Sequence, residues 1–173
     1  MTMHIADQGR TCRRAAADAA DTSRCEGVRT ALEVFIERRS PSDSGKLSAA
    51  DAAWPKRLRR IIRASLTYWG LPQLIDVAEL LLTELATNAL RHGRSTEIGV
   101  RVYLAGHHCV IEVAGGSPDR PEVRRAGPSD EGGRGLFLVA AMAEAWGVSP
   151  DGSTTWCTVP LTEGPAEMQP AAT

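Results

Sequence analysis

The chain has 173 residues, of which 43% are hydrophobic and 24% charged, with a formal net charge of −1 at pH 7. These values are typical of one ordinary globular domain, and they exclude nucleic acid binding through bulk positive charge. No apolar run approaches the roughly 18 residues that span a bilayer, and the N-terminus lacks the apolar core of a signal peptide, so we expect a cytoplasmic protein with no membrane contact.

The first 45 residues are expected to form an extension. Residues 1–25 mix charged residues with Ala and show no sustained periodicity, which is typical of disorder. Residues 26–39 predict a short helix, and SPSDSG at 40–45 predicts a linker. The apolar residues that share one face of this helix are Val28, Leu32, Phe35 and Ile36.

The globular pattern begins near Trp54, where Pro55 suits a first helical position. The residues that follow at helical spacing are Leu58, Ile61, Ile62, Ser65 and Trp69. Gly70 ends this helix. The opposite face carries Lys56, Arg57, Arg59, Arg60 and Arg63. This basic face is either a solvated surface, a docking surface for an acidic partner, or part of a dimer contact.

The rest of the chain predicts two more helices and four strands. The helices are expected at 72–92 and 136–146, and the strands at 98–104, 110–113, 146–149 and 154–159. A polar stretch at 115–135 has the composition and length of a functional lid. This order predicts an α+β fold, a two-layer α/β sandwich whose mixed sheet carries helices on one face. The domain would span 46–161, with 162–173 as a disordered tail.

The second helix contains the segment ELATNALRH at 84–92. Glu84, Asn88 and His92 fall within roughly an 80° arc at 3.6 residues per turn. Asn88 is expected within the apolar stripe formed with Val77 and Leu81. Taken alone, it is a buried amide that bonds to backbone; with a carboxylate one turn earlier, it suits a hard cation such as Mg²⁺.

A second motif, EGGRGLFLV at 131–139, places glycines directly before an apolar helix. Backbone N–H groups at such a helix start favour an anion, and glycine lets the backbone approach a phosphate closely. Arg134 adds a positive charge. Taken alone, the motif also fits a plain turn before a helix, and it is not a P-loop because no GK[ST] follows.

Together, the segments ELATNALRH, IEVAGGSP and EGGRGLFLV resemble the N box and two glycine boxes of the ATPase superfamily shared by histidine kinases, gyrase, heat-shock chaperones and mismatch-repair proteins. Residues 69–93 and 132–148 are most similar to its stand-alone branch, the RsbW-like anti-sigma-factor serine kinases and related bacterial regulatory proteins. The resemblance covers about 46–161. It implies the Bergerat-type ATP-binding fold, with ATP and Mg²⁺ as cofactors.

The resemblance also implies roles for individual residues. Asn88 would ligate Mg²⁺, and Glu84 would be the general base that takes a proton from a substrate hydroxyl or a water. His92, with Arg91, would lie near the phosphates or the lid, and Thr154 or Thr155 near the adenine. The phosphates would be held by Gly133, Arg134 and Gly135, with Leu136 opening the helix behind them.

One position departs from the family pattern. Gly115 stands where the family places an Asp that accepts a hydrogen bond from the adenine amino group. Losing such a bond costs about 1–3 kcal/mol, or roughly 10- to 100-fold in affinity.

Three functions therefore remain open. The first is an ATP-dependent regulator, an anti-sigma-factor-like serine/threonine kinase that acts on a sigma factor or an anti-sigma antagonist. The second is a pseudo-kinase that sequesters its partner without nucleotide, and the third is a site with altered base preference. A homodimer through the first helix or a sheet edge is a further expectation.

Overall fold

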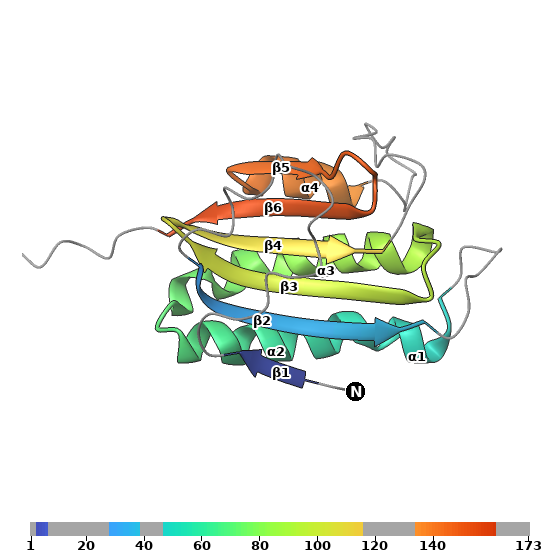
Figure 1. The fold of residues 1–173 in the computed structure, drawn as a ribbon, viewed down its shortest axis with the longest axis horizontal. Coiled ribbons are helices and arrows are strands. Elements are labelled where there is room, and N and C mark those ends of the chain that lie inside the picture. Colours follow the sequence, from blue (N-terminus) through green and yellow to red (C-terminus); the bar gives the residue numbers. More distant parts are fainter. Residues whose placement is uncertain (1–2, 7–27, 39–46, 116–133, 162–173) are drawn as a thin grey trace, which may run out of the picture.

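The computed structural model describes residues 3–6, 28–38, 47–115 and 134–161. Six strands form one sheet in the order β1-β2-β3-β4-β6-β5, which Figure 1 shows face on. The elements in chain order are β1 (Met3–Ala6), β2 (Val28–Glu37), α1 (Ala49–Ala52), α2 (Trp54–Tyr68), the 3-10 turn η2 (Pro72–Leu74), α3 (Ile75–His92), β3 (Glu97–Ala105), β4 (His108–Ala114), α4 (Arg134–Met142), β5 (Ala145–Val148) and β6 (Thr154–Pro160).

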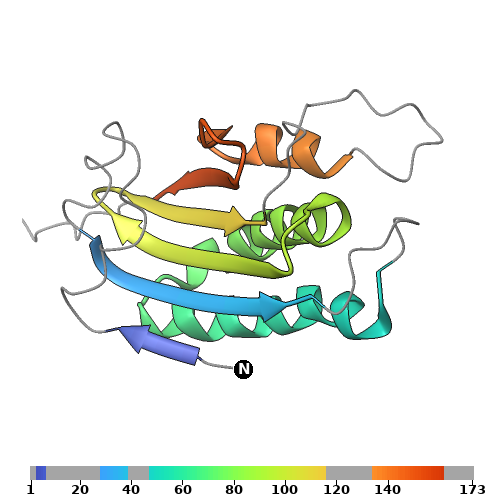
Figure 2. The ribbon, with the colours of Figure 1, turned by 45° about the vertical axis from the view of Figure 1, so that its right-hand side comes forward.

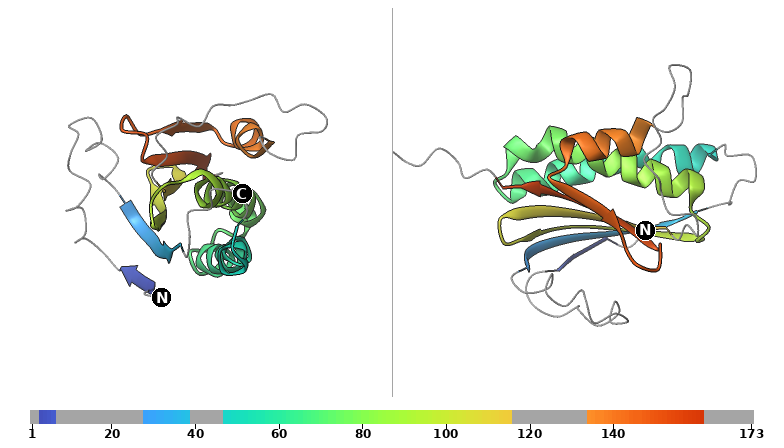
Figure 3. Two further views of the ribbon diagram at one scale, coloured as in Figure 1. Left: turned by 90° about the vertical axis from the view of Figure 1, so that its right-hand side faces the viewer. Right: turned by 90° about the horizontal axis from the view of Figure 1, so that it is seen from above.

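The helices α2, α3 and α4 cover one face of this sheet, as Figures 2 and 3 show. Alternate residues of β3 point into the layer between sheet and helices, where Ile98, Val100 and Val102 are at most 1% exposed. The predicted two-layer α+β sandwich is thus confirmed. Each described strand pair is antiparallel, so the prediction of a mixed sheet was wrong in that respect.

The segment predicted as a short helix at 26–39 is the strand β2, which pairs with β3 along its length. Leu32, Val34 and Ile36 alternate into the core at no more than 4% exposure, whereas Phe35 lies on the opposite face. The β-branched and aromatic residues of this run favour a strand once a neighbouring edge is available. The sheet therefore includes residues before position 46, and Met3–Ala6 adds β1 beyond β2.

The helix α2 starts at Trp54 with Pro55 in its first turn, as predicted. Its apolar face is buried against α3 and the sheet, and Gly70 follows the helix with a φ of 74°. On the exposed basic face, Arg63 forms an ion pair with Glu79 at 2.7 Å, and Arg57 stacks over the Trp54 ring at 5.0 Å. Part of this charge is therefore engaged within the domain itself.

The strands β3 and β4, which pair as an antiparallel hairpin, lie at their predicted positions, and β5 and α4 lie within a few residues of theirs. Cys109 and Cys157 are buried free thiols. Within the described ranges, no helix has the length and apolar character needed to cross a membrane. Of the lid predicted at 115–135, residues 116–133 fall outside the described residues, as does the tail predicted at 162–173. Of the residues 1–25 expected to be disordered, Met3–Ala6 form β1 and 7–25 fall outside the described residues.

Candidate functional site

The helix α3 carries Glu84 and Asn88 one turn apart, separated by roughly 6 Å along the helix axis. Both side chains are half-buried and border the stripe that contains Leu81 and Leu85, each 1% exposed or less. Asn88 was expected inside this stripe but lies at its edge, and Val77 is also only half-buried. In the described part of the chain, neither Glu84 nor Asn88 makes a side-chain hydrogen bond or ion pair.

Gly135, in the first turn of α4, lies directly against Glu84. A Cβ built on Gly135 would be 2.5 Å from Oε2 of Glu84 and 3.6 Å from its Cδ. A Cβ at this distance would force the flexible carboxylate of Glu84 to move, so glycine lets the first turn of α4 lie directly against that carboxylate as it stands. The structure therefore brings together two motifs that are 51 residues apart in the chain (135 − 84).

The start of α4 is held in place by its apolar residues. Leu136 is 9% exposed and Val139 is 0% exposed, and both belong to the core. The unpaired backbone N–H groups of the first turn and the helix dipole favour an anion at this end. Gly133 and the side chain of Arg134 lie outside the described residues, so their predicted phosphate contacts stay predictions.

His92 and Arg91 occupy the last turn of α3 and are exposed. Cationic side chains there complement the negative end of the helix dipole. His92 is eight residues beyond Glu84 (92 − 84), which is roughly 12 Å along the helix axis. The structure therefore does not bring His92 to the Glu84–Gly135 contact.

Gly115, at the end of β4, lies where three segments meet. Its N–H donates to the Ser153 carbonyl at 3.1 Å, and its own carbonyl accepts from the Ser95 N–H at 3.2 Å. A Cβ at Gly115 would be 2.8 Å from the Cβ of Ala89 on α3, so the glycine is required for this packing. The absence of an acidic side chain here is thus accompanied by a close approach of β4 to α3.

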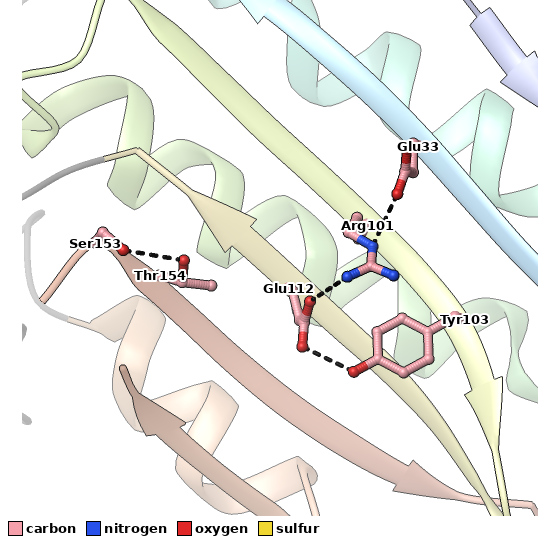
Figure 4. Close-up of polar contacts among 6 residues, drawn as sticks. All are labelled: Glu33, Arg101, Tyr103, Glu112, Ser153 and Thr154. Atoms are coloured by element: carbon pink, nitrogen blue, oxygen red, sulfur yellow. Dashed lines mark hydrogen bonds and ion pairs between the residues drawn. The ribbon is translucent and has the colours of Figure 1, made fainter. Parts of the chain in front are cut away.

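Thr154 and Thr155 point to opposite faces of β6. Thr154 pairs with Ala114, whereas Thr155 pairs with Val113, which is 2% exposed in the core. Thr155 therefore faces the helix layer. Thr154, the other threonine expected near the adenine, lies on the opposite face, with its hydroxyl 3.4 Å from that of Ser153, as Figure 4 shows. Of the two threonines, Thr155 is therefore the one on the same side of the sheet as Glu84 and Gly135.

The open face of the sheet carries a polar cluster across β2, β3 and β4 (Figure 4). Arg101 pairs with Glu33 at 2.9 Å and with Glu112 at 3.6 Å, and the Tyr103 hydroxyl donates to Glu112 at 2.8 Å. Such cross-strand pairs stabilise neighbouring strands in register. They lie on the face opposite Glu84 and Gly135 and so are separate from the candidate site.

Sequence reasoning missed two residues that shape the site. Ala89 is the small side chain that allows Gly115 to approach α3. Arg38, 8% exposed, donates hydrogen bonds to the Leu90 carbonyl in the last turn of α3 and to the Ser95 carbonyl in the loop that follows. No local pattern marks Arg38, because it is more than 50 residues away from these carbonyls in the chain. Ala89 can be read from the sequence as a small residue directly after Asn88, but its contact with Gly115 follows only from the fold.

The oxygen ligands at this site fit Mg²⁺ in part. Within the described segments, no group of three or more His, Cys, Asp or Glu side chains could hold a metal ion. Asn88 and Glu84 supply an amide and a carboxylate oxygen on one helix ridge. Mg²⁺ keeps several waters and takes other ligands from phosphate oxygens, so two protein oxygens are compatible with a metal bound together with a nucleotide.

A family profile described as a histidine kinase-like ATPase domain matches residues 47–159, well over half of the chain. No curated protein matched it. The match spans α2, α3, the β3-β4 hairpin, α4 and the closing strands, including both halves of the Glu84–Gly135 contact. The chain therefore belongs to the family of histidine kinase-like ATPase domains.

Proposed function

We propose that this ATP-binding regulatory domain is a protein kinase that transfers the terminal phosphate of ATP to a serine or threonine of a partner protein. The observation that supports it most is the contact between Gly135 and the Glu84 carboxylate, because it joins a base to an anion-binding helix start. The partner would be a sigma factor or an anti-sigma antagonist, in keeping with the resemblance to anti-sigma-factor kinases.

Each residue would have a distinct task in this reaction. Glu84 would accept the proton of the attacking hydroxyl, since its carboxylate lies beside the phosphate position. Backbone N–H groups from Gly135 onward would hold the phosphates, and Thr155 would lie near the base. Asn88 would hold Mg²⁺, which supplies neutralisation of phosphate charge. Phosphoryl transfer requires mainly such positioning and charge stabilisation.

Calorimetric titration with ATP and Mg²⁺ tests the nucleotide part. We expect saturation in the micromolar range for the wild type, weakened binding for Asn88→Ala, and near-normal binding for Glu84→Gln. The matched control is Glu79→Gln, which removes a carboxylate from the same helix at its ion pair with Arg63. Absence of saturation below millimolar ATP in the wild type would rule out the proposal.

The packing of Gly115 favours a second candidate, a pseudo-kinase that binds its partner without nucleotide. Because Gly115 fits tightly against Ala89, the chain cannot regain an acidic side chain there without a shift of α3. This candidate predicts that partner affinity is unchanged by ATP and by Asn88→Ala. A shift of that affinity on adding ATP would contradict it.

A nucleotide site with no carboxylate at position 115 would also select adenine less strongly. Comparing the affinities for ATP and GTP decides this base preference.

A further inference from the structure

Arg38 is a nearly buried arginine that directly follows β2, with 8% of its surface exposed. Its guanidinium donates to the carbonyl of Leu90 at 3.0 Å and to that of Ser95 at 3.1 Å, and it also donates to the carbonyl of Gly93. Its backbone N–H donates to the carbonyl of Thr96 at 2.8 Å. One residue thus binds the last turn of α3 and the loop that leads to β3.

These bonds satisfy groups that the helix itself leaves unpaired. The last four carbonyls of an α-helix have no intrahelical partner, and Leu90 supplies one of them. A positive charge at this end also complements the helix dipole. The planar guanidinium can donate to three carbonyls at once from one position, whereas the ammonium of a lysine is a compact point charge.

The same contacts lead to the candidate site. Leu90 is two residues beyond Asn88 on α3, and the Ser95 N–H donates to the Gly115 carbonyl at 3.2 Å. Arg38 therefore fixes both the helix turn after Asn88 and, through Ser95, the end of β4. It precedes the region matched by the family profile, which begins at residue 47.

We propose that Arg38, which directly follows β2 and precedes the family domain, is a positioning residue for the nucleotide site. The inference rests on the proposed function, since it takes Asn88 as a nucleotide ligand. Without the guanidinium, the last turn of α3 and the start of the next loop lose their bonds, and Asn88 loses its fixed orientation. Partners of this kind, one step removed from the ligand, typically change affinity about 10- to 100-fold.

The test measures the dissociation constant of Mg²⁺-ATP for wild type, Arg38→Ala and Arg38→Lys. We expect both variants to bind at least about 10-fold more weakly, and added methylguanidinium to restore part of the affinity of Arg38→Ala only. The control is Ile36→Ala, which opens a cavity in the core at a fully buried position of β2, two residues before Arg38. It lowers stability but leaves ATP affinity of the folded protein within about threefold, as expected for a core substitution that touches no site contact.

Amide hydrogen exchange separates the two proposals. In Arg38→Ala and Arg38→Lys, we expect faster exchange at residues 90–96 than in wild type and in Ile36→Ala. Unchanged affinity in both Arg38 variants, with ATP bound normally by wild type, overturns the inference while the proposed function stands. If wild type binds no ATP, the proposed function fails together with the nucleotide role of Arg38. In that case, the amide exchange rates at residues 90–96 test by themselves whether Arg38 fixes the end of α3. Unchanged rates in both Arg38 variants would overturn this structural role too.

Discussion

Replacing Gly115 by alanine places a methyl group where β4 touches α3. The new Cβ would be 2.8 Å from the Cβ of Ala89 and 3.5 Å from its Cα. Both Cβ atoms are attached directly to backbone, so neither can rotate away, and β4 and α3 must separate. Overpacking of this kind costs about 1–3 kcal/mol. For a domain of this size, each kcal/mol corresponds to a fall in Tm of roughly 2–4 °C.

Thermal unfolding followed by circular dichroism measures this effect. Gly99→Ala is the matched control, because Gly99 pairs with Ala114 in the adjacent strand and its new Cβ would be 3.7 Å from that side chain, an ordinary contact. We expect a change within about 0.5 kcal/mol for the control.

A double-mutant cycle with Ala89→Gly then isolates the contact. Ala89→Gly alone should cost about 1 kcal/mol of helix propensity. Combined with Gly115→Ala, it removes the clash, so the double variant should be more stable than the sum of the single changes predicts by more than about 1 kcal/mol. A Gly115→Ala variant as stable as wild type, or additive changes in stability, would refute this account of why glycine is needed.

The Ala89→Gly variant also leaves room for Gly115→Asp. In that double variant, a gain of affinity for ATP over GTP would reveal base recognition at this position.

Three further predictions concern titration and catalysis. Burial raises the pKa of the Cys109 and Cys157 thiols to about 12, so both stay protonated and unreactive at pH 8. In a variant whose two N-terminal cysteines are replaced by serine, Ellman's reagent at pH 8 should label neither thiol until the protein unfolds. Hydrogen bonds from Ser149 and Ser153 lower the pKa of Asp151 from 3.8 to about 2. The ionised carboxylate therefore stabilises the β5-β6 turn above pH 3.8, and this contribution to stability is lost as the pH falls through about 2. The Tm difference between wild type and Asp151→Asn should therefore shrink on acidification; a constant difference from pH 5 to 2 would contradict this. Glu84→Gln should lower the rate of phosphoryl transfer by at least about 100-fold with little change in ATP affinity, and an equal loss in both would remove its role as base.

Much of the fold could be predicted from sequence because its helices and hairpin have strong, long patterns. The 54–69 and 72–92 helices are amphipathic and are bounded by Pro and Gly signals, so their limits were nearly correct. β2 was misassigned because a short apolar run fits both periods. Leu32 and Ile36 share a face in a helix and also in a strand. Only the presence of the β3 edge, some 60 residues later, decides between them.

The candidate site was less predictable, because its contacts depend on the close approach of distant segments. The order of the motifs along the chain predicted that Glu84 and Gly135 contribute to one site. They lie on α3 and α4, which belong to the same helix layer. The register of β6 against β4, which no spacing reveals, decides that Thr155 and not Thr154 faces the helices. The anchoring of α3 by Arg38 likewise follows only from the position of β2 in the sheet.

The most direct test is a crystal structure of the protein with Mg²⁺ and a non-hydrolysable ATP analogue. We predict phosphate density at the start of α4 beside Gly135, with the metal near the Asn88 side-chain oxygen and Glu84 facing the terminal phosphate. A structure at saturating analogue with that space still empty, or with the nucleotide bound elsewhere on the domain, would contradict the account.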